Sequence, residues 1–264
     1  MQQGYVFYLQ MPLTIVAMLW YTVINNGCNK KFEEMITQRN AYKTGHLLAR
    51  PKEKVGTSEF KTGVQPLKLD GRRDGFFYVP KGYKGDKPAG LAVMLHGAGG
   101  QAEHGLNLLQ QYADDHNIVL LAPASRAGTW DIIASDSFDA DVRFIDQALS
   151  LVFDRYNVDT SHIALGGFSD GASYALSLGL SNGDLFTHII AFSPGFYFTV
   201  APVGRPAIYI SHGVNDGVLP IDPCSRRIVP QLQRQGYKVN YKEFNGEHQI
   251  PAGISAGAVE WFKK

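Results

Sequence analysis

The sequence has few cysteines and no excess of charge. Cys28 and Cys224 are the only cysteines among 264 residues, too few for a disulfide framework or a cysteine-based zinc site. The 25 Lys and Arg residues against 24 Asp and Glu leave a net charge of +1 at pH 7, so nothing points to nucleic acid or an acidic surface as a partner. The hydrophobic share of 45% is enough for one substantial core.

One long uncharged run stands at the N-terminus. Tyr5 to Ile24 contains no charged residue and is long enough to span a bilayer. Three interpretations are open: a signal peptide, an uncleaved signal anchor, and a bacterial lipoprotein signal with Cys28 as the lipidated residue. A start at Met11 would shorten the run. We expect an exported protein with a membrane tether through residues 5–28; an anchored or cytoplasmic protein is the alternative.

The rest of the chain divides into two parts. Residues 29–66 are polar and mixed, without a periodic apolar face, and are expected to form a linker and lead-in after the leader at 1–28. From residue 67 to 264, apolar runs alternate with helical patterns. A hairpin is expected first, with strands at 67–69 and 76–79. Further strands are expected at 91–95, 118–122, 162–166, 187–193, 206–211 and 238–244, and helices at 101–115, 139–156, 171–181, 223–236 and 253–263.

This alternation predicts an α/β fold with a mostly parallel central sheet that has helices on both faces. Only about a dozen residues separate Ser193 from Arg205, too few for a large cap domain. Binding sites in such sheets lie beyond the carboxyl ends of the strands, and here we expect an open, shallow site.

The most informative motif is Gly167-x-Ser169-x-Gly171, between an expected strand and an expected helix. In this context it predicts a nucleophile elbow, in which a serine on a strained turn projects from the sheet edge. The glycines allow the cramped turn and the close approach of strand and helix. The alternative is that Ser169 only caps the helix.

A carboxylate and an imidazole follow in the order that a serine nucleophile requires. Asp216 comes just after the strand at 206–211, and His248 comes after the last strand. Ser, Asp and His in this chain order can meet at one sheet edge, where the histidine takes the serine proton and the aspartate orients the histidine. Asp222 is a rival for the acid, and His96 and His212 are expected to organise loops through hydrogen bonds.

A glycine-rich loop supplies the fourth part. Leu95-His96-Gly97-Ala98-Gly99-Gly100 follows an apolar strand. Acyl transfer builds negative charge on a carbonyl oxygen, which two backbone N–H groups can stabilise. We expect these from Ala98 and from Asp170, the residue after the nucleophile.

Together, Leu-His-Gly-x-Gly, Gly-Phe-Ser-Asp-Gly, His-Gly-x-x-Asp-x-x-x-Pro and Gly-x-His-x-Ile-Pro resemble the phospholipase/carboxylesterase family of α/β-hydrolases, which includes acyl-protein thioesterases and lysophospholipases. Thr129-Trp130-Asp131 and residues 141–146 also resemble secreted polyhydroxybutyrate-depolymerase-like and feruloyl-esterase-like relatives. The resemblance covers residues 67–264. It implies a catalytic domain with the α/β-hydrolase fold and a serine esterase with Ser169 as nucleophile, Asp216 as acid and His248 as base. Glu247 departs from the glycine usual in the thioesterases.

These residues predict a serine carboxylesterase that acts on small-molecule esters with short-chain or aromatic acyl groups and requires no cofactor. A thioesterase, a lysophospholipase and a polyester depolymerase could use the same residues, and a non-catalytic, membrane-tethered binding module is the alternative from another class. The expected substrate contacts are Trp130, Phe196, Val218 and Ile250.

Overall fold

The computed structural model describes residues 33–52 and 60–264. The expected leader at 1–28 and its tether lie outside the described residues. The chain divides after Asn40, and the compact unit from Ala41 to Lys264 holds the sheet and its helices. Among the helices that the structure describes, none is both long and apolar enough to cross a membrane.

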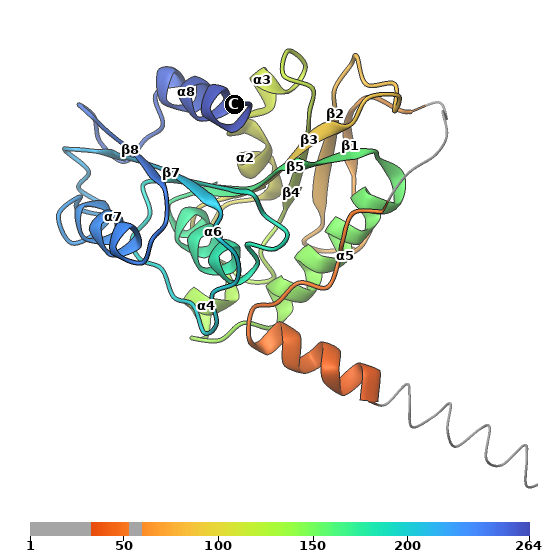
Figure 1. Ribbon diagram of the computed structural model, residues 1–264, viewed down its shortest axis with the longest axis horizontal. Helices are drawn as coiled ribbons and strands as arrows, with labels where there is room; N and C mark the ends of the chain where they lie inside the picture. The colour runs from red at the N-terminus through yellow and green to blue at the C-terminus, as the bar shows by residue number, and fades with distance from the viewer. Residues whose placement is uncertain (1–32, 53–59) are drawn as a thin grey trace, which may run out of the picture. The chain divides into compact units, whose positions relative to one another are not determined.

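The described part of this unit contains one eight-stranded sheet, in the order β1-β2-β4-β3-β5-β6-β7-β8 (Figure 1). The first two strands pair antiparallel, and β2 also runs antiparallel to β4, whereas all pairs from β4 to β8 are parallel. The strands are β1 (Gly63–Pro66), β2 (Gly75–Val79), β3 (Ala89–Leu95), β4 (Ile118–Pro123), β5 (Val158–Phe168), β6 (His188–Phe192), β7 (Ala207–Gly213) and β8 (Val239–Phe244).

Helices cover both faces of the sheet. Figure 1 shows α4, α5, α6 and α7 on one face and α2, α3 and α8 on the other. They are α2 (Ala102–Asn107), α3 (Gln110–Ala113), α4 (Asp131–Ala134), α5 (Ala140–Arg155), α6 (Asp170–Ser181), α7 (Ser225–Arg234) and α8 (Ala252–Phe262). This is the α/β-hydrolase arrangement that the sequence predicts.

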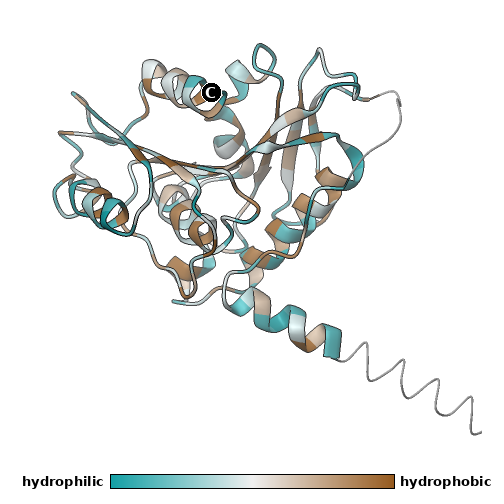
Figure 2. Ribbon diagram, in the orientation of Figure 1, coloured by the Kyte–Doolittle hydropathy of each residue, from teal (hydrophilic) through white to brown (hydrophobic). Residues whose placement is uncertain are grey.

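Burial explains why each element forms where it does. Every residue of β3 and of β4 is buried, as expected for strands covered on both faces. In contrast, α5 buries one side only, and Figure 2 shows hydrophobic and hydrophilic turns alternating along it. Side chains of alternate residues on β3 enter different clusters: Leu91 and Val93 lie in one core, and Ala92 and Met94 in the core on the opposite face.

The lead-in differs from its prediction, because the compact unit begins at residue 41 rather than 67. Leu47 is 1% exposed, and its N–H donates to Asn182 Oδ1 at 2.8 Å. Tyr42 donates its hydroxyl to Asp146 Oδ2, also at 2.8 Å. Two buried polar side chains, Asp146 of α5 and Asn182 directly after α6, therefore hold a segment that lacks any periodic pattern of its own.

Two smaller differences concern boundaries. The first strand of the hairpin is β1, at Gly63–Pro66, a few residues before the expected 67–69. The helix expected at 101–115 is two short helices, because Leu109 has a non-helical backbone between α2 and α3.

The register of the parallel strands brings distant loops to one edge. Leu95 pairs with Gly167, Phe168 with Phe192, and Gly213 with Phe244. The chain beyond each of these positions therefore emerges at the carboxyl edge of the sheet, where the candidate residues follow.

Candidate active site

Ser169 occupies a strained turn between β5 and α6. Its backbone has φ 57° and ψ −120°, outside the regions that a residue with a side chain prefers. A hydrogen bond from its N–H to Phe192 O, 2.9 Å long, holds the turn to β6. A Cβ at Gly167 would lie 2.5 Å from the backbone of Gly171, so the motif requires glycine there. The Ser169 side chain makes no capping hydrogen bond to α6, which argues against a role as a helix cap alone.

Asp216 and His248 form a close pair on the loops after β7 and β8. His248 Nδ1 lies 2.6 Å from Asp216 Oδ2, and the Asp216 side chain is fully buried. Burial alone would raise the Asp216 pKa, but the hydrogen bond from His248 and the N–H groups of Leu219 and Val218 outweigh it, so the pKa lies below its ordinary value. The carboxylate is therefore ionised and able to stabilise an imidazolium.

The rival acid lies on the surface. The Asp222 side chain is 78% exposed and forms an ion pair with Arg226 at 2.9 Å. In the described part of the chain, Asp222 forms no hydrogen bond with His248, whereas Asp216 contacts His248 directly. The geometry favours Asp216.

His248 approaches the elbow from the side of β8. Its ring lies 4.6 Å from the ring of Phe168, the residue before Ser169. No hydrogen bond between the Ser169 hydroxyl and His248 Nε2 is formed among the described residues. Such contacts are often long before substrate binds. Of the three expected catalytic residues, Asp216 and His248 are the two that are already in contact.

The glycine-rich loop lies beside the nucleophile. A Cβ at Gly97 would be 3.4 Å from Ser169 Cβ. Neither the Ala98 N–H nor the Asp170 N–H has an acceptor within the described chain, so both are available to a ligand. Two free amides flanking a serine form the arrangement that stabilises an oxyanion.

His96 organises this loop, as predicted. Its Nδ1 lies 2.7 Å from Gly97 O, and its Nε2 accepts the Ser125 N–H at 3.0 Å. Burial lowers the His96 pKa, so the ring is neutral, with its proton on Nδ1 facing the carbonyl.

His212 does the same for the acid loop. It is fully buried, with Nε2 2.8 Å from Leu219 O and 3.2 Å from Asp216 Oδ2. Its Nδ1 lies 2.7 Å from Ser225 Oγ. A proton on Nε2 satisfies all three partners, because the Ser225 hydroxyl can then donate to Nδ1.

The prediction that Trp130 contacts substrate is wrong. The side chain is 0% exposed, its indole N–H donates to His96 O at 2.9 Å, and its ring stacks on Tyr174. Trp130 instead holds the glycine-rich loop in place through its hydrogen bond to the His96 carbonyl.

The other expected substrate contacts are at least partly exposed to solvent. Phe196 is 40% exposed and Val218 is 68% exposed, whereas Ile250 is half-buried and packs with the cluster that contains Phe168. Their contact with substrate stays a prediction.

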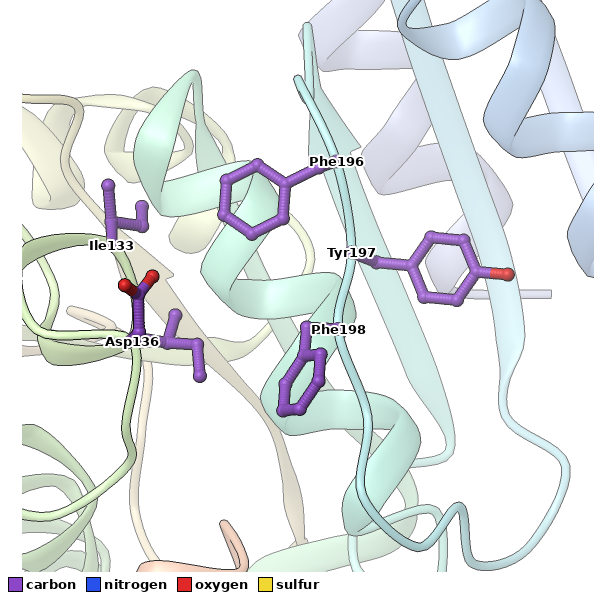
Figure 3. Close-up of a pocket in the computed structure, with 6 residues that line it drawn as sticks. Ile133, Asp136, Phe196, Tyr197 and Phe198 are labelled. Atoms are coloured by element: carbon purple, nitrogen blue, oxygen red, sulfur yellow. The ribbon is translucent and has the colours of Figure 1, made fainter.

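A groove of about 430 Å³ lies between residues 196–198 and a wall formed by α4 and the turn after it. Nothing in the sequence indicates the α4 wall. Figure 3 shows Phe196 and Phe198 turned toward α4 and the turn after it, and Tyr197 turned away. The opposite wall carries Ile132, Ile133 and Asp136. Only the aromatic run of Phe196 to Phe198 could be noticed in the sequence.

Comparison with known proteins identifies the family of this chain. A model of the Esterase family matches residues 68–235, more than half of the chain. An acetylxylan esterase from Coprinopsis cinerea is 28% identical over 184 residues, 65% of this chain and 46% of the relative. Feruloyl esterase C from Emericella nidulans is 28% identical over 177 residues, 61% of this chain and 63% of the relative. The chain thus spans about half to two thirds of these relatives.

Solved structures share the fold. A ferulic acid esterase from Anaeromyces mucronatus, solved with ferulic acid, is 18% identical with a TM-score of 0.56, covering 82% of this chain and 93% of that one. An S-formylglutathione hydrolase from Staphylococcus aureus is 14% identical with a TM-score of 0.62, covering 81% of this chain and all of that one. At such low identity these matches bear on the fold alone.

Proposed function

The chain belongs to the Esterase family, and we propose that it hydrolyses carboxylic esters through an acyl-enzyme on Ser169. The observation that carries the proposal is the Asp216–His248 contact of 2.6 Å, on the same sheet edge as a strained serine with free amides beside it. A binding protein has no need of this combination.

The reaction proceeds in two acyl transfers. His248 Nε2 removes the Ser169 proton, and the hydroxyl oxygen attacks the ester carbonyl carbon. The N–H groups of Ala98 and Asp170 hold the negative oxygen of the tetrahedral intermediate. The bond to the alcohol oxygen breaks as His248 gives that oxygen its proton. Water then attacks the acyl-enzyme with His248 as base, which releases the acid and restores Ser169.

Esters of aromatic or short acyl groups are the proposed substrates. Relatives of the chain include an acetylxylan esterase and a feruloyl esterase. Among the described residues, the connection between β6 and β7 contains no helix that could form a large cap. The narrower phospholipase/carboxylesterase assignment, with thioesters, lysophospholipids or polyesters as substrates, stays a competing proposal on the same residues.

The test compares the full chain, purified in mild detergent, with its Ser169→Ala variant. Hydrolysis of p-nitrophenyl acetate and butyrate should be present in the first and reduced by about 10³-fold or more in the second. Far-ultraviolet circular dichroism should be the same for both. Near-native hydrolysis by the alanine variant would remove Ser169 from the mechanism. Absence of hydrolysis in both folded proteins would favour the non-catalytic binding module.

We also propose export with a membrane tether through residues 5–28. The support is the uncharged run from Tyr5 to Ile24 with Cys28 beyond it. Fractionation of cells that produce the full chain and its Cys28→Ser variant tests this. A lipidated Cys28 predicts membrane association that the variant loses. Association that survives the substitution would point to an uncleaved anchor, and recovery of the native chain in the cytoplasm would refute export.

A further inference from the structure

We propose that Thr129 is a positioning residue for ester hydrolysis: its hydroxyl holds the Asp170 carboxylate, and with it the Asp170 N–H, in place for the oxyanion. Thr129 belongs to the β4–α4 connection, residues 124–130, which also holds the glycine-rich loop that carries Ala98. The inference rests on the proposed ester hydrolysis and deepens it, because it assigns the alignment of both oxyanion donors to one connection.

The N–H of Asp170 belongs to a peptide group that the strained turn orients. Ser169, on the near side of this peptide, has φ 57° and ψ −120°, and such a conformation persists only where its surroundings determine it. The Ser169 N–H donates to Phe192 O at 2.9 Å, which holds one end of the turn to β6. The Thr129 hydroxyl donates to Asp170 Oδ2 at 2.6 Å, which holds the other end. Because the carboxylate and the N–H of Asp170 are attached to one Cα atom, release of the carboxylate frees the peptide to turn.

The β4–α4 connection also fixes the glycine-rich loop on both sides of Ala98. Before it, the Trp130 indole N–H donates to His96 O at 2.9 Å. After it, the Gly99 N–H donates to Gly128 O at 2.7 Å. The two oxyanion amides are therefore held by three consecutive residues of a single connection, so their separation is set in one place.

Two buried carboxylates hold the β4–α4 connection itself. Asp141, near the start of α5 and 1% exposed, accepts the Arg126 N–H at 2.6 Å and the Asp131 N–H at 2.7 Å. Asp131 in turn accepts the Asp141 N–H at 2.9 Å and the Tyr174 hydroxyl at 2.9 Å. Buried groups of α5 and α6 therefore bond to the connection and to the residue after it, as a support for two aligned donors requires.

A purely structural role for Thr129 is the competing interpretation. Asp170 is the first residue of α6, where a carboxylate stabilises the helix through its dipole. If the Thr129 hydroxyl only supported the helix, its loss would lower stability and leave kcat of the folded enzyme unchanged. A positioning role predicts a lower kcat at an unchanged KM, because the oxyanion forms only after the substrate has bound.

The experiment measures kcat and KM for p-nitrophenyl butyrate with the full chain, in mild detergent, and with its Thr129→Val and Thr129→Ser variants. Valine has the shape of threonine without the hydroxyl. We expect Thr129→Val to lower kcat about tenfold at an unchanged KM, less than the roughly 10²- to 10³-fold loss of a whole oxyanion donor, because the Asp170 N–H itself remains. Serine keeps a hydroxyl, so Thr129→Ser should retain most of the native kcat.

A second readout uses butylboronic acid as a mimic of the tetrahedral intermediate. Its boron accepts the Ser169 oxygen and becomes tetrahedral and negative, while the serine proton passes to His248. Thr129→Val should raise the inhibition constant by about the factor that it takes from kcat. The matched control is Thr160→Val, the same change at an exposed position near the amino end of β5; it should alter neither kcat nor inhibition. Thermal unfolding of each variant shows that it is folded.

A double-mutant cycle with Asp170→Ala connects the effect to the hydrogen bond. If the contact is the cause, the double variant should lose no more than the greater of the two single losses. A native kcat in Thr129→Val, a loss that appears in KM instead, or additive losses in the cycle would overturn the inference while the proposed function stands. Absence of hydrolysis by the native chain would overturn the proposed function, and the inference with it.

Discussion

Replacement of Asp216 by asparagine tests the triad most sharply, because it changes charge and hydrogen bonding but not size. Asp216 Oδ1 accepts the N–H groups of Val218 and Leu219 at 2.9 and 2.8 Å. An asparagine will keep its carbonyl oxygen toward these two donors. Its NH₂ group then occupies the position of Oδ2 and faces His248 Nδ1, which is 2.6 Å away in the native protein.

The consequence is a histidine in the wrong tautomer. Facing a donor, His248 Nδ1 must act as acceptor, so the proton moves to Nε2, the nitrogen that should take the Ser169 proton. A comparable substitution in another Ser-His-Asp enzyme lowers kcat by about 10⁴-fold, which corresponds to about 5 kcal/mol in the activation barrier. We expect a loss of about 10³- to 10⁴-fold here.

The assay is kcat for p-nitrophenyl butyrate with Asp222→Asn as the matched control. Asp222 loses only a surface ion pair to Arg226, and such pairs contribute little, so its activity should stay within about twofold of native. Thermal unfolding of both variants should show that they are folded. Equal losses in the two variants, or a loss below tenfold for Asp216→Asn, would refute the reasoning.

Three further outcomes are expected. His212→Phe removes the Nε2 donor beside Asp216 and should lower kcat about tenfold with little change in KM. A tenfold rise in KM would instead show that the substitution disturbs substrate binding as well. Gly171→Ala would place a Cβ 2.5 Å from His96 O and should destabilise the fold by several kcal/mol; an unchanged melting temperature would contradict this. Burial first, and then the charge of His162, lowers the His188 pKa to about 4. Because the unfolded chain then binds more protons between about pH 4 and 6.5, stability should fall on acidification through that window, and His188→Gln should flatten this fall in denaturant titrations.

The placement of the candidate residues at one edge of the sheet can be predicted from the sequence, because each of them follows directly from a local pattern. Ser169 lies between a strand and a helix, and Asp216 and His248 each follow a strand. In a parallel sheet, such positions share one edge by geometry, so their proximity can be inferred without knowing any side-chain contact.

Local strand and helix patterns in the sequence do not determine the exposure of a side chain or its long-range contacts. Trp130 stands in a loop, which suggests a surface position, but His96 and Tyr174 from other elements enclose it. Likewise, Leu47 is fixed by Asn182, a residue 135 positions away. No local periodicity reveals such a partner, which is why residues 29–66 were expected to form only a linker and lead-in. Asp136 gains its place in the groove only through the fold.

The connection between β6 and β7 has an evolutionary consequence. It carries Phe196 and Phe198 but none of the triad, and two serine hydroxyls of α6 bond its backbone N–H groups rather than its side chains. Its sequence can therefore change while its path is preserved. Substitutions in this short stretch would change the lining of the groove without altering Ser169, Asp216 or His248.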